Sequence, residues 1–287
     1  AMRMLCAGAL SLAFLAVRRR DVLARVFAER RTVGRLAVFG FGLLGSQITF
    51  AISIAYTNAG TATVLQMTGS VFIMLFVCLR ARTAPRAGEA LGLAAALAAT
   101  YLIATQGDFG ALRLPVEGVL WGVANGLAVA LYVVYPKESG LFERFGGLAT
   151  TGLGMAVGAV YATIVWLVRA IISLAAGDGA EALRIVAPPL DASGWAVLAL
   201  GVGVVGTFVA YALYLSGVAR VGSVAGGLLG AVEPLAATSL SAVWLGTAFS
   251  GADWAGFALM LAMIALVTIK GPKARTDAAG EGADQAG

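Results

Sequence analysis

The sequence predicts an all-α protein whose helices cross a membrane, and three observations lead to this fold class. First, 60% of the 287 residues are hydrophobic and 12% are charged, with a mean hydropathy of +0.90, and a water-soluble domain cannot bury that much apolar surface. Second, the apolar residues gather in runs of about 20, the length of a membrane-spanning helix. Third, the runs lack the alternation of barrel strands, and only helices and closed barrels satisfy their backbone in lipid.

Nine apolar segments are predicted to form the helices of this bundle. Most connections between them are short, apart from 18–35 and 173–192, and the second of these has the glycines and prolines of a solvent loop. The tail 271–287 is rich in glycine, alanine and mixed charges, and we expect it to be disordered. In chain order the segments are 2–17, 36–56, 60–79, 88–105, 114–135, 147–172, 193–215, 221–245 and 252–270.

The basic residues predict the orientation of these helices. With nine helices, 16 lysines and arginines fall in segments on one side of the membrane and 3 on the other, and Arg3 lies at the start of a helix. The positive-inside rule assigns the side with 16 to the cytoplasm, which makes the C-terminus cytoplasmic. This asymmetry explains the sequence pI of about 9.5 without nucleic acid as a partner.

The composition excludes several function classes. The chain has no histidine, and its two cysteines, Cys6 and Cys78, lie in separate apolar runs, so no metal centre or disulfide framework is predicted. A phosphate-binding Gly-Lys-Ser/Thr loop, a Gly-x-Ser-x-Gly elbow and paired intramembrane aspartates are also absent from the sequence. We therefore expect no cofactor and no enzymatic activity. A secondary transporter is the leading class, and a non-transporting membrane scaffold or accessory subunit is the alternative.

An internal repeat divides the chain into two related parts. A shift of 164 residues places 42–104 over 206–268 without a gap, with coinciding helix boundaries and a few identities. The second part has five helices and the first has four, so we expect the natural protein to have ten and this chain to begin after the first. Units of five helices return in opposite orientation, which makes an inverted repeat. The predicted parts are 1–105, the first repeat; 114–270, the second repeat; and 271–287, a cytoplasmic tail.

Two sequence segments carry a resemblance to a known family. They are 56–66 (YTNAGTATVLQ) and 230–235 (GAVEPL). With Arg3 opening a helix, they make the chain similar to the EamA type of the drug/metabolite transporter superfamily over residues 1–270. The chain departs from that pattern at Ser70, where a proline is frequent, and lacks the Gly-Glu pair that often follows the fourth helix of each half. The resemblance implies a ten-helix bundle with a central cavity, and transport, often outward, of amino acids, other metabolites and drugs.

Glu233 and Pro234 are the first candidates for functional residues. Glu233 is the only carboxylate placed deep inside a predicted helix, and an ionisable group at membrane depth is costly and often functional. Low dielectric favours its neutral form, which would suit coupling to a proton. The alternative is that Glu233 stabilises the bend expected at Pro234, whose nitrogen carries no hydrogen. Our hypothesis is that Glu233 lines the cavity.

Other polar side chains in the predicted helices are candidates for the same cavity. Trp121, Asn125 and Tyr132 share one helix face at spacings of four and seven residues, and Gln47 and Asn58 share a face of another helix. For each residue the alternative is packing between helices or, for Tyr132, a place at the membrane interface. The predicted substrate-binding residues are Gln47, Asn58, Gln66, Trp121, Asn125, Tyr132, Tyr211, Tyr214 and Glu233. By contrast, Gly118, Gly122 and Gly126 have the four-residue spacing of close helix packing.

These observations predict a secondary transporter of small metabolites in a bacterial inner membrane, working by alternating access. A cavity lined by tyrosine and tryptophan with few fixed charges favours neutral or zwitterionic solutes, amino acids among them, and the family resemblance implies export. The predicted partners are the small-molecule substrate, the lipid bilayer, and a coupling proton or an exchanged solute. The oligomeric state, monomer or homodimer, is left open.

Overall fold

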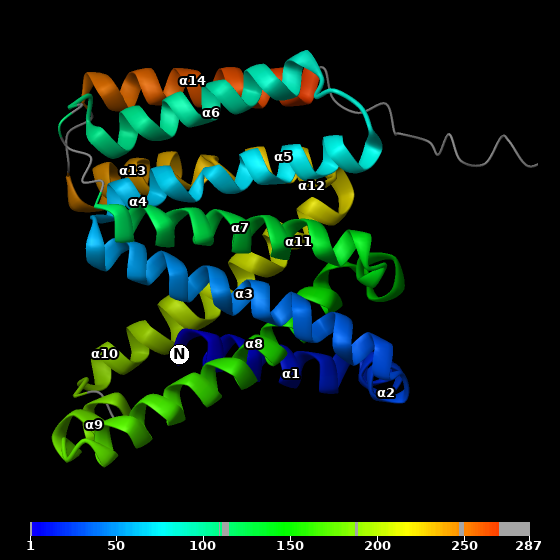
Figure 1. Ribbon diagram of the computed structural model, residues 1–287, viewed down its shortest axis with the longest axis vertical. Coiled ribbons are helices and arrows are strands. Elements are labelled where there is room, and N and C mark those ends of the chain that lie inside the picture. Colours follow the sequence, from blue (N-terminus) through cyan, green and yellow to red (C-terminus); the bar gives the residue numbers. More distant parts are fainter. Residues whose placement is uncertain (1, 109, 111–114, 187–188, 247–249, 270–287) are drawn as a thin grey trace, which may run out of the picture.

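The computed structural model is a bundle of roughly parallel helices whose connections gather at two opposite ends (Figure 1). It describes residues 2–108, 110, 115–186, 189–246 and 250–269, and within these residues there is no strand. The tail 271–287, predicted to be disordered, lies outside the described residues. The helices are α1 (Met2–Arg18), α2 (Arg20–Ala28), α3 (Arg30–Tyr56), α4 (Ala59–Gln66), α5 (Thr68–Ala81), α6 (Ala87–Thr105), α7 (Val116–Glu138), α8 (Leu141–Ala175), α9 (Gly179–Val186), α10 (Ala192–Ala196), the π-helix η2 (Val197–Val209), α11 (Ala210–Val221), α12 (Ser223–Gly230), α13 (Val232–Leu245) and α14 (Gly251–Ile269).

Each of the nine predicted apolar segments coincides with helix in the described part of the chain. Six helical spans there are long and apolar enough to cross a membrane, with α4–α5 and α10–η2–α11 each counted as one span. The other three segments correspond to α1, with 17 residues, and to the shorter apolar stretches Ser223–Ala236 and Gly251–Leu266. In the six long spans, 17% to 39% of the most apolar window is buried inside the protein, so each span keeps apolar residues that the bundle does not fully bury. The chain is therefore a multi-pass membrane protein.

The segment 173–192 is helical in part, where a solvent loop was expected. α9 occupies its centre, and its turn residues flank the helix rather than interrupt it. Asp178 caps α9, because its side chain accepts a hydrogen bond from the amide of Glu181 at 2.9 Å. The indole of Trp166 on α8 donates to the carbonyl of Ile185 at 2.7 Å, which holds α9 against α8.

The internal repeat is visible in the helix bounds. α12, α13 and α14 begin and end 164 residues after α4, α5 and α6 respectively, which is the shift found in the sequence. Both halves are interrupted at the same place, at Met67 between α4 and α5 and at Ala231 between α12 and α13.

A proline is not required for this interruption. Pro234 lacks the amide hydrogen that would bond the carbonyl of Gly230, the last residue of α12. Its counterpart Ser70 has that hydrogen, but the amide bonds the carbonyl of Met67, three residues back, at 3.0 Å. The half without the proline therefore breaks at the corresponding residue.

The glycines of α7 bring it close to the first half, as predicted. A Cβ atom added at Gly122 would lie 2.6 Å from Cβ of Leu65, and one added at Gly126 would lie 2.9 Å from the nitrogen of Gly69. Neither position has room for a side chain. α7 thus packs directly on α4 and α5, while α6 and α14 lie side by side at the far edge of the bundle (Figure 1).

Most charged groups gather at one end of the bundle, which we call the basic face. It comprises α2, the α5–α6 connection and the α7–α8 connection, at the right of Figure 1, together with Arg220 near the end of α11. Two ion pairs tie helices together there. Arg80 on α5 contacts Glu138 on α7 at 2.8 Å, and Arg144 on α8 pairs with Glu29, which precedes α3.

Candidate substrate-binding cavity

A cavity of about 440 Å³ lies inside the bundle, between elements of both halves. It is lined from α1, α3 and α4–α5 of the first half and from α7, η2, α11 and α12–α13 of the second. Seven of the nine predicted binding residues are brought together in its wall. They are Gln47, Gln66, Asn125, Tyr132, Tyr211, Tyr214 and Glu233.

Local breaks in the helices bring several of these residues to the cavity. Gln66 and Met67 line it at the break between α4 and α5, and Gly230 lines it next to the break between α12 and α13. Glu233 follows that second break by two residues, in the first turn of α13. The π-helix η2 precedes Tyr211, and the hydroxyl of Thr207 donates to the carbonyl of Val202 at 2.7 Å, five residues back. Irregular helix geometry of this kind is common where helices form functional sites.

Hydrogen bonds across the cavity wall connect the two halves. The amide of Gln47 on α3 donates to the hydroxyl of Tyr211 on α11. The hydroxyl of Ser70 on α5 donates to the carbonyl of Gly227 on α12 at 3.2 Å. The rings of Tyr132 and Tyr211 lie 5.9 Å apart between centroids, at a tilt of 52°, within the range of favourable aromatic pairs. The two hydrogen bonds therefore join the repeats across the cavity wall, and the ring pair joins α7 to α11 within the second repeat.

Two buried polar atoms in this wall have no hydrogen-bond partner. Asn125 donates through its amide nitrogen to the carbonyl of Ser46 at 2.6 Å, which leaves its Oδ1 without a donor. Nε of Arg3 is likewise buried and unpaired. Among the described residues only one other buried side-chain atom is in this state, Oγ1 of Thr100. Buried polar groups are nearly always paired in proteins, so these two atoms are candidate hydrogen-bonding groups for a polar ligand.

The cavity wall carries one basic and one acidic side chain. They are Arg3, the second residue of α1, and Glu233. Phe50, Val129 and Leu229 supply apolar surface between the polar groups. An arrangement of a cation, an anion, amides, phenols and apolar side chains suits a small amphipathic solute. No group of three or more metal-ligating side chains occurs in the described part of the chain.

Two predicted binding residues lie outside this cavity. Asn58 caps α4, where its side chain accepts a hydrogen bond from the amide of Thr61 at 2.7 Å. Trp121 is 38% exposed and does not line the cavity, although it shares a helix with Asn125. Sequence reasoning also missed Ser46 and Ser70, which do line it. The repeat could have found Ser70, because the shift of 164 places it over Pro234.

Comparison with known proteins gives one family and the same fold. The sequence pattern of the EamA-like transporter family matches residues 1–105 and 116–269. A protein of Salmonella typhimurium, described as an uncharacterized inner membrane transporter, YicL, is 28% identical over 269 residues, which cover 93% of this chain and 83% of that protein. A solved structure described only as the crystal structure of a protein superposes with a TM-score of 0.70 at 20% identity, and covers 93% of this chain and 85% of its own.

Proposed function

Since this chain belongs to the EamA-like transporter family, we propose that it carries small zwitterionic or amphipathic metabolites, amino acids among them, across a bacterial inner membrane. The Salmonella relative, which is described as an inner membrane transporter, supports that location. We further propose that the basic face and the C-terminus lie in the cytoplasm, and that transport runs outward by alternating access.

The presence of Arg3 and Glu233 in the wall of one cavity is the observation that carries the substrate class. A guanidinium binds a carboxylate through two parallel hydrogen bonds, and a carboxylate binds an ammonium group. A zwitterion offers both groups, and the tyrosines and Phe50 would surround its side chain. A volume of about 440 Å³ fits a solute of that size with a few waters.

The two repeats, 1–105 and 114–270, are the units that we propose to rock about this cavity. The breaks at Met67 and Ala231 lie at the cavity in both repeats, and helices bend where their backbone ladder is interrupted. The driving partner would be a proton taken up by Glu233 or an exchanged solute. Among the described residues, Glu233 is the only carboxylate in the wall of the cavity, and a carboxylate that has taken up a proton no longer attracts an ammonium group by charge.

Uptake into proteoliposomes tests this proposal. Labelled zwitterionic amino acids, amines and organic acids are supplied in separate pools, and Glu233→Gln and Arg3→Gln are compared with the unchanged protein. We expect saturable uptake of the zwitterion pool that falls at least roughly tenfold in both variants, because each loses a charge-assisted contact worth about 1.5–3 kcal/mol. Glu117→Gln, which removes an exposed carboxylate outside the cavity, is the matched control and should transport normally.

Each alternative has its own result in this assay. Uptake that survives Glu233→Gln makes Glu233 a structural residue and removes it from the coupling mechanism. Preference for amines that is unaffected by Arg3→Gln rejects the zwitterion class. Folded protein that moves none of the pools favours the scaffold or accessory-subunit alternative.

A further inference from the structure

A second cavity, of about 560 Å³, opens at the basic face and shares no residue with the central cavity. Three elements meet around it: the end of α1, the first turns of α8 and the end of α11. Its wall includes Arg18, Arg19 and Arg220, and none of the described residues that line it carries a carboxylate. Three guanidinium groups around one cavity repel each other, so the site favours an anion.

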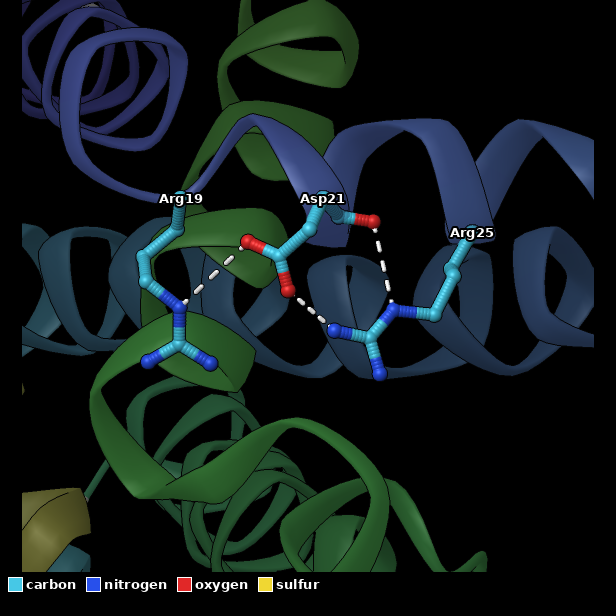
Figure 2. Close-up of polar contacts among 3 residues, drawn as sticks. All are labelled: Arg19, Asp21 and Arg25. Atoms are coloured by element: carbon cyan, nitrogen blue, oxygen red, sulfur yellow. Dashed lines mark hydrogen bonds and ion pairs between the residues drawn. The ribbon is translucent and has the colours of Figure 1, made fainter.

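Asp21, which follows Arg18 and Arg19 in the sequence and lies on α2, is already engaged. Figure 2 shows Asp21 between Arg19 and Arg25. Arg25 donates to both the side chain and the carbonyl of Asp21, and this hydrogen bond is the main reason that the pKa of Asp21 is lowered. Arg19 lies farther away, with Nε at 3.7 Å from the carboxylate. Within the described residues, Arg18 and Arg220 have no ion pair with any carboxylate.

The backbone of α8 adds to the positive potential of this cavity. α8 leaves helical dihedrals at Gly146 (φ 77°, ψ 162°) and resumes at Gly147, so a long helical segment begins in the cavity wall. The start of a helix carries a partial positive charge and favours anions. Gly147 also brings α11 close, because an added Cβ there would lie 2.8 Å from Cα of Ser216.

Apart from Ser216, the remaining side chains of the wall are apolar, which distinguishes this site from a cluster of charges on the protein surface. Phe14 and Phe145 line it together with Leu148, which is 45% exposed. The charged groups therefore lie beside apolar surface, at the end of the helices where lipid headgroups would lie. Basic pockets between helices on the cytoplasmic side of membrane proteins suit acidic headgroups.

We propose that this cavity binds a phosphate group through Arg18, Arg220 and Arg19. The apolar wall favours an acidic phospholipid of the adjoining leaflet as its source. Because α1 belongs to the first half and α8 and α11 to the second, a bound headgroup would connect the two halves at the basic face. The site is independent of the substrate proposed for the central cavity.

Lipid retention and thermal stability of the purified full chain test this site. The protein in neutral detergent receives phosphatidylglycerol, phosphatidylcholine or inorganic phosphate, and native mass spectrometry counts the bound lipid. We expect phosphatidylglycerol to be retained and to raise the melting temperature more than phosphatidylcholine does. The double variant Arg18→Gln/Arg220→Gln should weaken phosphatidylglycerol binding roughly tenfold or more, because two charge-assisted contacts are lost.

The control variant is Arg30→Gln/Arg31→Gln, which removes the same charge from exposed positions of the basic face. Equal loss of lipid in both double variants would overturn the proposal, since it would show general attraction to surface charge. Protection by inorganic phosphate that depends on Arg18 and Arg220 would support the phosphate site and assign it to a soluble ligand. If the glutamine variant fails to fold, Arg18→Lys/Arg220→Lys keeps the charge and removes the guanidinium fork; unchanged affinity in that variant would also overturn the proposal.

Discussion

Two faces that the internal repeat relates are covered differently. In the first half, α7 lies over α3 and α4–α5, and the hydroxyl of Ser53 donates to the carbonyl of Gly118 on α7 at 3.1 Å. The residues 164 positions after Gly42, Ser46 and Thr49 are Gly206, Ala210 and Leu213. Gly206 and Ala210 line the central cavity, and Leu213 is 70% accessible. Among the described residues, α7 therefore covers the face that carries Thr49, the covered face, and no helix covers the face that carries Leu213, the open face.

The two faces also differ at the residue that matters most to the cavity. Gly69 follows the break in the first half, and an added Cβ there would lie 3.0 Å from Cβ of Val129 on α7. Its counterpart in the repeat is Glu233, which lines the cavity instead. At this position the first repeat packs against α7, and the second repeat places a carboxyl group in the cavity wall. The two repeats therefore share their helix bounds, and residues that differ between them line the cavity.

The largest effect is expected from filling the covered face. Gly126→Leu should destabilise the protein by about 3 kcal/mol or more, because a side chain there meets the backbone of α5 and α7 cannot move away without losing its contacts. Gly217→Leu is the matched change on the open face, where an added Cβ meets nothing within 4 Å, and should change stability by no more than about 0.5 kcal/mol. Thermal unfolding in detergent measures both. Equal losses would show that α7 does not distinguish the two faces.

A smaller effect is expected from exchanging side chains between the faces. Thr49 lies under α7, where its hydroxyl is 3.4 Å from the amide nitrogen of Asn125 and donates to the carbonyl of Gly45 at 2.7 Å. Thr49→Leu should cost about 1–3 kcal/mol, since it adds volume to a packed site and removes a partner of Asn125. The reverse change at the counterpart position, Leu213→Thr, should be nearly neutral in the same unfolding measurement. A costly Leu213→Thr would mean that this face is covered in the detergent-solubilised protein.

The sequence predicted the helices and their repeat because both follow from local chemistry. The apolar runs set the nine segments, and the shift of 164 residues matches the bounds of α4–α6 and α12–α14 to the residue. Among the residues that line the cavity, the sequence predicted those with the highest free-energy cost of exposure to lipid, such as Glu233 and Asn125. The division of the chain at 105–114 and the cytoplasmic C-terminus remain predictions.

Other features depended on packing that no single helix reveals. Trp121 and Asn125 share a helix at a spacing of four, but the cavity wall takes in only Asn125. Asn58 was a polar residue at a helix end, and its role as the cap of α4 uses its side chain locally. The sequence did not predict the helix α9, because glycine and aspartate occur both in loops and at the start of helices.

The smallest effect is expected at the basic face, for the ion pair between Glu29 and Arg144, which has no counterpart in the second repeat. Glu29 pairs with Arg144 on α8, whereas the shift of 164 residues places the uncharged Ser193 at the corresponding position. A hydrogen bond from Thr32, followed by the charge of Arg144, lowers the pKa of Glu29 below its ordinary value of 4.5. The ion pair therefore stabilises the protein above pH 4.5 and is lost as the pH falls through the lowered pKa.

Glu29→Gln measures this contribution against its pH dependence. The melting temperature should fall slightly at neutral pH, since the pair is largely open to solvent, and the difference from the unchanged protein should disappear in acid. Glu143→Gln removes an exposed carboxylate close to the same arginine in sequence and should show no such pH-dependent difference. If both variants show the same pH-dependent change in melting temperature, the effect comes from the net charge of the basic face and not from the ion pair between Glu29 and Arg144.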